Sequence, residues 1–229
     1  MKKAIIFSLV YCVLYLVSSP AHAQSVDILW QGGTYTPPFF EGLPLWSRQS
    51  QITFVAVTLD VPNPNNLFYK WIRNGTVLGL VSGIGKGSLS FSDTIFSKPV
   101  NIGVEVLDVN ENLIAQNSIT VSPTESYIEV YENHPLYGFL FNRAVLGAYT
   151  LEKSEVTLAA FPLYFSVNYR DDPELKYSWK SINGTEPQSM VTYRAPEDTE
   201  GTASISLEIA HIYFLRQLAK SGLLIEFGK

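Results

Sequence analysis

The stretch FYKWIRNGT, from Phe68 to Thr76, is nearly repeated later in the chain as KYSWKSINGT, from Lys176 to Thr185. In both stretches Tyr-x-Trp places two large aromatic side chains on one face of a strand, because side chains alternate along an extended backbone. The Asn-Gly that follows predicts a tight hairpin turn, since both central residues of that turn need positive φ. We therefore expect each stretch to be a strand with an aromatic inner face, followed by a hairpin.

These two stretches belong to a longer repeat. Tyr69 and Trp71 match Tyr177 and Trp179 at an offset of 108 residues. In both halves, alternating apolar runs are separated by clusters of Pro, Asn, Gly and Ser in the same order, a pattern typical of antiparallel strands. A repeated order with small changes in loop length indicates a tandem duplication. We therefore predict an all-β chain of two tandem antiparallel β-sandwich domains, in which each Trp fills the space between two sheets.

The predicted boundary between the domains is the polar stretch SPTES, so that domain 1 spans residues 24–122 and domain 2 spans residues 123–229. The strands YKW and YSW, with the passage VEVLDVNENLIAQNSITV, resemble those of bacterial secreted proteins with tandem Ig-like or PKD-like domains. The cysteine pair of antibody-type domains is absent. The resemblance therefore implies a shared fold, and a shared fold does not imply a function.

The N-terminus has the pattern of a secretory signal peptide. Lys2 and Lys3 precede the apolar run AIIFSLVYCVLYLV, and SSPAHA then ends in Ala-x-Ala, which predicts a signal peptide at residues 1–23 with cleavage near Ala23. The run has 14 residues, fewer than the ~20 of a spanning helix. We therefore predict an extracytoplasmic protein, secreted or associated with the cell surface. An uncleaved N-terminal segment would be its route to a membrane.

Charge and cysteine content narrow the expected partners. Without Lys2 and Lys3 the chain carries 14 basic and 21 acidic residues, a net charge of −7, and it has no cluster of Lys and Arg. We therefore expect no nucleic acid partner, because phosphates attract basic surfaces. The only cysteine, Cys12, lies in the predicted signal peptide, so the exported part must do without a disulfide, as domains of ordinary size can.

The sequence shows no constellation for catalysis, a cofactor or a metal. DVNEN, at residues 108–112, has side-chain oxygens that suit Ca²⁺, but it lies between two alternating runs, where Asp and Asn favour a turn. His134 and His211 lie in different predicted domains, without the further ligands that zinc needs. DDPE, at residues 171–174, is an acidic loop, but acid–base catalysis would need a cleft around it. We therefore expect a protein that is not an enzyme.

The stretch TYTPPFFEGLPLW, at residues 34–46, is unusually rich in aromatic residues. Exposed, coplanar rings there would suit a sugar, which makes this loop a candidate aromatic platform. However, YENHPLYGFLFN, at residues 131–142, is a loose counterpart in the second half, and a feature present in both copies is more readily explained by packing. The candidate platform residues are Tyr35, Phe39, Phe40 and Trp46.

The stretch HIYFLRQLAK, at residues 211–220, differs from the first half, where a short turn connects the last two strands. Its apolar residues recur at a spacing that fits a short helix, while its position also fits a protruding hairpin. Exposed apolar residues on a loop indicate a contact surface, whereas side chains that fold inward would form a lid on domain 2. The candidate partner-binding residues are Ile212, Leu215, Arg216 and Leu218.

From the sequence we interpret the chain as an exported, non-catalytic structural or recognition protein of the bacterial cell surface or envelope. Its partner would be a protein held through loops of the sandwiches, or a glycan. One alternative is a carbohydrate-binding module that uses the loop at residues 34–46. Another is a protein like the pilus-assembly chaperones, which also have two Ig-like domains. That function needs an exposed edge strand and a basic anchor, for which the sequence shows no motif.

Overall fold

The computed structural model describes residues 24–38, 40–61, 63–151, 154–195 and 200–228. The predicted signal peptide, its cleavage site near Ala23 and the candidate platform residue Phe39 lie outside these residues. The described residues form β-strands joined by turns, with one short 3₁₀ turn, η1 (Pro64–Asn66). They include no helix that is long and apolar enough to cross a membrane. The predicted all-β fold is confirmed.

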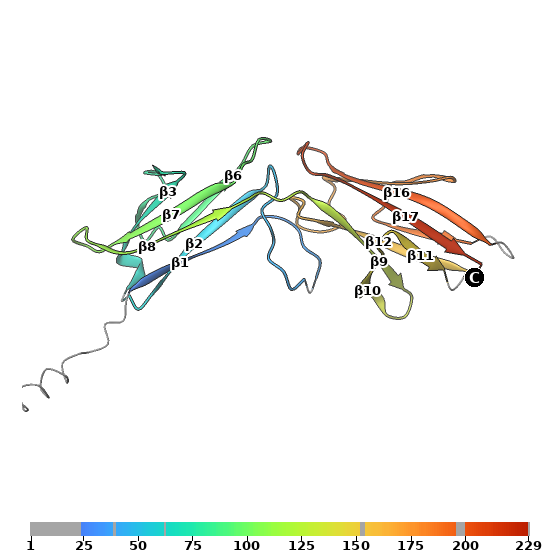
Figure 1. The fold of residues 1–229 in the computed structure, drawn as a ribbon, viewed down its shortest axis with the longest axis horizontal. Helices are drawn as coiled ribbons and strands as arrows, with labels where there is room; N and C mark the ends of the chain where they lie inside the picture. Colours follow the sequence, from blue (N-terminus) through green and yellow to red (C-terminus); the bar gives the residue numbers. More distant parts are fainter. Residues whose placement is uncertain (1–23, 39, 62, 152–153, 196–199, 229) are drawn as a thin grey trace, which may run out of the picture. The chain divides into compact units, whose positions relative to one another are not determined.

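The strands follow one another along the chain, and the connection between β1 and β2, residues 33–50, is a long loop (Figure 1). Those of the first half are β1 (Ser25–Gly32), β2 (Gln51–Leu59), β3 (Phe68–Arg73), β4 (Thr76–Val77), β5 (Gly83–Ile84), β6 (Ser88–Ser92), β7 (Val100–Leu107) and β8 (Leu113–Val121). Those of the second half are β9 (Tyr127–His134), β10 (Gly138–Ala144), β11 (Ala148–Leu151), β12 (Glu155–Leu163), β13 (Leu175–Ser181), β14 (Gly184–Glu186), β15 (Met190–Arg194), β16 (Gly201–His211) and β17 (Leu218–Phe227).

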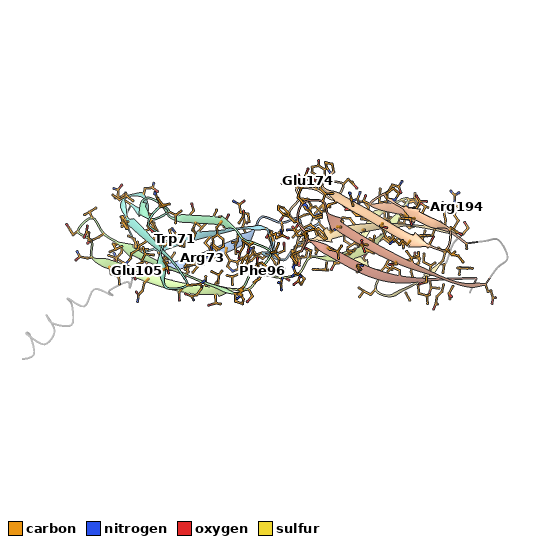
Figure 2. The ribbon with its side chains drawn as sticks, turned by 90° about the horizontal axis from the view of Figure 1, so that it is seen from above. Trp71, Arg73, Phe96, Glu105, Glu174 and Arg194 are labelled. Carbon is orange, nitrogen blue, oxygen red and sulfur yellow. The ribbon has the colours of Figure 1, made fainter. Side chains whose placement is uncertain are left out.

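Two sheets build the first half. One has the order β1-β2-β6, and the other has the order β4-β3-β7-β8, with β5 also paired to β3. Alternate side chains are buried along the strands, Ile52 and Phe54 on β2 and Tyr69 and Trp71 on β3. The indole N–H of Trp71 (Figure 2) donates to the carbonyl of Lys86 at 2.9 Å. The indole therefore connects its own sheet to the turn that leads into β6.

Two further sheets build the second half. Their orders are β10-β9-β12-β15 and β11-β17-β16-β13-β14. The pairs described within them are antiparallel except β11 with β17, which is parallel. The long strands β16 and β17 lie side by side over most of their length (orange and red in Figure 1). One core joins residues of both sheets, among them Val130, Leu158, Trp179, Leu207 and Leu223.

The two halves share details beyond the order of their strands. In each half a tyrosine two residues before the tryptophan donates from its hydroxyl to a carbonyl of the preceding loop. Tyr69 donates to Pro64, and Tyr177 donates to Arg170. Each tyrosine hydroxyl thus finds the partner that a buried phenol needs, in the same place in both copies.

The described residues group into two compact units that do not coincide with the halves. One unit contains the described residues up to Ile28, Ala56–Gly87 and Gly103–Ser118, and the other contains Leu29–Val55, Ser88–Ile102 and the described residues from Ile119 onward. The strands β1, β2, β7 and β8 have residues in both units. The domain boundary at residues 122 and 123 stays a prediction.

Strand β12 is buried on both faces. The side chains that face the core between the sheets are Val156, Leu158 and Ala160. The opposite face is buried in a second apolar group, which we call the outer cluster and which consists of Tyr131, Ala159, Phe161, Leu163 and Tyr164. Tyr35, Phe40 and Leu45 pack against the outer cluster. A segment remote in sequence thus covers a sheet face that is often exposed to water in antiparallel sheets.

The two Asn-Gly pairs have different conformations. Asn74 and Gly75, with φ of 48° and 81°, form the centre of the β3–β4 hairpin, which confirms the predicted turn. In the second half Ser181 pairs with Gly184, so the turn consists of residues 182 and 183 and the predicted Asn-Gly turn is wrong. The second half has one more residue between its Trp and its Asn, and this residue moves Gly184 out of the turn and into β14.

Candidate functional site

The connection between β16 and β17 is a hairpin turn at residues 212–217, which we call the tip. Its backbone is closed by two hydrogen bonds, from the N–H of His211 to the carbonyl of Gln217 at 2.9 Å and from the N–H of Gln217 to the carbonyl of Phe214 at 2.8 Å. The helix alternative is therefore wrong, and the hairpin alternative is confirmed. Pairing between β16 and β17 extends to Ala210 and Leu218, and residues 212–217 form turns and bends between the two strands.

Gln217 fixes the tip to its surroundings, and it is 1 % exposed. Its Nε2–H donates to the carbonyl of Arg48 at 3.1 Å and to Oγ of Ser166 at 2.7 Å. Its Oε1 accepts from the N–H of Ser166 at 2.7 Å. The N–H of Arg216 also donates to Oε1 of Gln49, at 2.9 Å. All these residues belong to the same compact unit, so the backbone of the tip is held at several points.

His211 supports the same turn from the end of β16. Its Nδ1 accepts from the N–H of Tyr213 at 3.1 Å, and its ring packs on Phe214 with 4.5 Å between ring centroids. Its Nε2 lies 3.2 Å from the carboxylate of Glu174 (Figure 2), whose carbonyl accepts from the N–H of Ile212 at 2.9 Å. Nδ1 therefore faces the N–H of Tyr213 in the turn, and Nε2 faces the carboxylate of Glu174 in the loop before β13. These contacts give His211 a structural role.

Although the backbone of the tip is fixed by hydrogen bonds, most of its side chains are exposed. The exposed fraction is 84 % for Leu215, 67 % for Tyr213 and 39 % for Ile212, and it is 45 % for Leu218 at the start of β17. Arg216 is also exposed. The lid alternative is therefore wrong for Leu215, because the residue that folds inward is the polar Gln217. The structure brings the candidate partner-binding residues together, with Ile212, Leu215 and Arg216 on the tip and Leu218 next to it at the start of β17.

The equivalent turn of the first half, at residues 108–112 between β7 and β8, is only one residue shorter. Oδ1 of Asp108 accepts from the N–H groups of Asn110 and Asn112, both at 2.8 Å, and Oδ2 accepts from Nδ2 of Asn112 at 3.0 Å. The hydrogen bonds from Asn112 lower the pKa of Asp108 below its usual value, because they favour the charged form. DVNEN is thus the turn that the sequence predicts, and the two turns differ in side chains rather than in length.

The candidate aromatic platform is not an open surface. Trp46 is fully buried. The N–H of Tyr35 donates to the carbonyl of Phe165 at 2.8 Å, and the carbonyl of Tyr35 accepts from the N–H of Tyr164 at 2.9 Å. Burial raises the pKa of the Tyr35 phenol. Phe40 packs against the outer cluster, so Tyr35, Phe40 and Trp46 are packing residues.

Residues of the acidic loop before β13 are also engaged in contacts with neighbouring side chains. Asp171 accepts a hydrogen bond from the Ser189 hydroxyl and pairs with Arg170 at 3.1 Å. Burial acts to raise the pKa of Asp171, but the bonds from Ser189 and Arg170 outweigh it and lower that pKa below its usual value. The Arg170 guanidinium lies over the rings of Phe139 and Phe161, at 5.0 and 5.2 Å from their centroids.

Across the described ranges, no group of three or more His, Cys, Asp or Glu residues could hold a metal ion.

The sequence matches no protein-family model and no curated protein, but the structure is similar to several solved structures. The three N-terminal domains of the Highly Immunogenic Outer Capsid protein (Hoc) of bacteriophage RB49 are 16 % identical, with 90 % of this chain and 59 % of that chain covered and a TM-score of 0.44. The fibronectin(III)-like modules of CbhA from Clostridium thermocellum are 11 % identical, with 88 % and 93 % covered and a TM-score of 0.31.

Immunoglobulin domains 1–4 of Sidekick-1 give a further match, at 11 % identity, with 92 % of this chain and 66 % of that chain covered and a TM-score of 0.25. The chain spans less than two thirds of the Hoc fragment. The resemblance to tandem Ig-like and fibronectin III-like sandwiches concerns the fold alone. At these TM-scores it carries no argument about function.

Proposed function

We propose that the chain is an exported binding protein without catalytic activity, and that it holds a protein partner at the bacterial cell surface or envelope through the tip. One observation carries this proposal, the contrast within the tip between a fixed backbone and exposed apolar side chains. Leu215 is 84 % exposed, whereas Gln217, two residues later, is 1 % exposed.

This contrast suits binding for a physical reason. A turn whose backbone is already fixed loses little conformational freedom when a partner covers it, so more of the contact energy remains as affinity. Burying a side chain such as Leu215 contributes about 1.5–3 kcal/mol. Arg216 adds a planar guanidinium group whose N–H donors suit carboxylate and carbonyl acceptors. Arginine and tyrosine are enriched among the residues that contribute most to binding at protein interfaces, and the tip exposes Arg216 and Tyr213.

The proposal is tested by capture from an envelope extract of the producing cells. The bait is the predicted mature chain, from Gln24 to Lys229, either unchanged or with Leu215→Ser and Ile212→Ser together. We expect a protein that is captured by the unchanged bait and lost with the doubly substituted bait. Chemical cross-linking with mass spectrometry then places the contact on the tip.

A matched control separates lost contact from lost folding. Leu146, in the turn before β11, is 82 % exposed and lies outside the tip, so Leu146→Ser should capture the same protein as the unchanged bait. All baits should melt within a few degrees of one another, since exposed substitutions change stability by only about 0.5 kcal/mol. Identical capture by the tip variant and the unchanged bait would show that the tip is not the binding surface.

A further inference from the structure

The first half contains a groove that, like the tip, has exposed apolar side chains but carries acidic instead of basic groups. It measures about 370 Å³, and its lining includes Phe68, Lys70, Ile84, Asp108, Val109 and Glu111. Its apolar walls face water, with exposed fractions of 69 % for Ile84, 80 % for Val109 and 38 % for Phe68. All these residues belong to one compact unit. The turn at residues 108–112, which is the counterpart of the tip in the first half, forms one wall.

The rim of the groove is acidic. Asp108 and Glu111 lie on the turn, and the hydrogen bonds that Asn112 donates to Asp108 favour its charged form. The cation in the lining, Lys70, pairs with Glu105 on β7 at 2.8 Å (Figure 2 labels Glu105). The pair neutralises the lysine, so two carboxylates remain beside the apolar walls. An occupant with an apolar side chain next to a cation would match this surface.

The tip has this chemistry. Leu215 is its most exposed apolar side chain, and Arg216 follows it directly in the sequence. A leucine side chain is small enough to enter a groove of about 370 Å³. The guanidinium can pair with one carboxylate through two parallel hydrogen bonds, which strengthens and orients such a contact. The same chain therefore carries an apolar, basic turn and an apolar, acidic groove.

We infer that the tip of one copy docks into the groove of a second copy of this chain. The inference names the partner of the proposed contact surface and rests on the proposed function of the tip. Leu215 contacts Ile84 and Val109 of the second copy, and Arg216 pairs with Glu111. Because the tip and the groove are different surfaces, each copy keeps one of each, and the contact extends into open chains unless the rotation between copies closes a ring.

The contact is small, and this sets the conditions of the experiment. A single turn in a groove buries less than the ~1,200 Å² of stable interfaces, so the association is weak. Sedimentation velocity of the chain from Gln24 to Lys229 should therefore cover about 10 µM to about 1 mM, which brackets weak dissociation constants. The average mass of the unchanged chain should rise continuously over this range.

Two variants remove the two surfaces separately. Leu215→Ser removes the anchor of the tip, and Ile84→Ser with Val109→Ser removes the walls of the groove. Each variant alone should remain monomeric, or associate at least about tenfold more weakly, while Leu146→Ser should associate like the unchanged chain. A mixture of the tip variant and the groove variant should form dimers and nothing larger. One member of the pair retains an intact groove, and the other retains an intact tip.

A charge exchange tests the proposed ion pair. Arg216→Glu and Glu111→Lys should each weaken association, because each brings like charges together. Mixing these two variants should restore association into chains in which the variants alternate, because the tip of each variant then meets a groove of opposite charge. Raising the salt concentration to about 1 M should weaken the association of the unchanged chain, since the Debye length falls to about 3 Å.

Several results would overturn the inference. The first is that the unchanged chain stays monomeric up to about 1 mM. The second is that the unchanged chain, the tip variant and the groove variant associate equally. The third is that the mixture of the tip variant and the groove variant forms no dimer. If the chain stays monomeric while tip-dependent capture of a different envelope protein persists, the inference fails and the proposed function stands. If neither occurs, both fail.

Discussion

The indole N–H groups of Trp71 and Trp179 make equivalent hydrogen bonds in the two halves of the chain. Trp71 donates to the carbonyl of Lys86 and Trp179 to the carbonyl of Gln188, both at 2.9 Å. Each acceptor lies two residues before the first residue of the next strand, β6 or β15. Both tryptophans are fully or almost fully buried, so the repeated Tyr-x-Trp preserves the same core contact and the same polar contact.

Substituting either tryptophan should therefore have the same effect. We expect Trp71→Ala and Trp179→Ala each to lower the free energy of unfolding by about 3–5 kcal/mol, because both leave a large cavity. Trp71→Phe and Trp179→Phe keep most of the volume but leave a carbonyl without its donor, and they should lose less. Urea unfolding followed by circular dichroism measures these losses. A loss under about 1 kcal/mol for one Ala variant would contradict the equivalence.

The two Asn-Gly pairs provide a matched comparison of backbone conformation. Asn74→Ala should lower the free energy of unfolding by about 1 kcal/mol, because Ala tolerates positive φ less well than Asn. Asn183→Ala should change it by less than about 0.5 kcal/mol, since Asn183 does not have positive φ. Thermal unfolding of the two variants side by side measures the difference. Equal losses would mean that both pairs form the same turn.

Asp108 should make stability depend on pH in a defined direction. Its folded-state pKa is lowered from the usual 3.8 by the hydrogen bonds from Asn112. Its charged form therefore stabilises the fold above that value, and this contribution is lost as the pH falls through the lower folded-state pKa. Asp108→Ala should lower the melting temperature at about pH 7, and the difference from the unchanged chain should shrink toward about pH 2.

Added calcium tests whether the turn at residues 108–112 binds a metal ion. Because the carboxylate already accepts three hydrogen bonds within the turn, added Ca²⁺ should leave the melting temperatures of both proteins unchanged. A rise for the unchanged chain that is absent in Asp108→Ala would show that the turn binds the ion.

Gln217 and Leu215 should respond to substitution in opposite ways. Gln217→Ala removes the partners of the Ser166 N–H and of the Arg48 carbonyl, and it should lower the free energy of unfolding by about 1–3 kcal/mol. Leu215→Ser should change it by less than about 0.5 kcal/mol, because the side chain is exposed. Chemical denaturation of both variants measures this contrast. A larger loss for Leu215→Ser would show that the leucine belongs to the core.

The outer cluster should contribute to stability like a second core. We expect Phe161→Ala to lower the free energy of unfolding by about 3–5 kcal/mol, although its face of β12 points away from the core between the sheets. Thr157→Ala, on the same strand, removes one hydroxyl contact with Thr192 and should lose about 0.2–1 kcal/mol. Similar small losses for both variants would mean that the outer cluster is loosely packed.

The sequence predicted which side chains face the core between the sheets better than it predicted burial on the opposite face of a strand. Val156, Leu158 and Ala160 follow the period of two that marks one face of a strand, and all three are in the core. The burial of Ala159 and Phe161 could not be derived from that period, because their cover includes a segment far away in the sequence, with Tyr35 and Phe40. An uninterrupted apolar run would have been the local signal for burial on both faces, and LAAFPL, within β12, is such a run.

The loops were predicted less well than the strands for a related reason. The three-residue spacing of Ile212, Leu215 and Leu218 is compatible with a helix, and only the pairing of β16 with β17 excludes it. The burial of Gln217 depends on Ser166 and on the carbonyl of Arg48, which local patterns do not reveal. The only local feature is an uncharged polar residue between Arg216 and Leu218, which is a weak signal for burial.

The double burial of β12 also has a consequence for motion. Its backbone pairs with β9 on one side and β15 on the other, and apolar side chains cover both of its faces. Water can reach its paired amides only after neighbouring strands and the covering segment have separated. In deuterated water these amides should be among the last to lose their protons, at a rate close to that of complete unfolding of their unit. The ends of β17 and the short strand β14 should exchange much earlier.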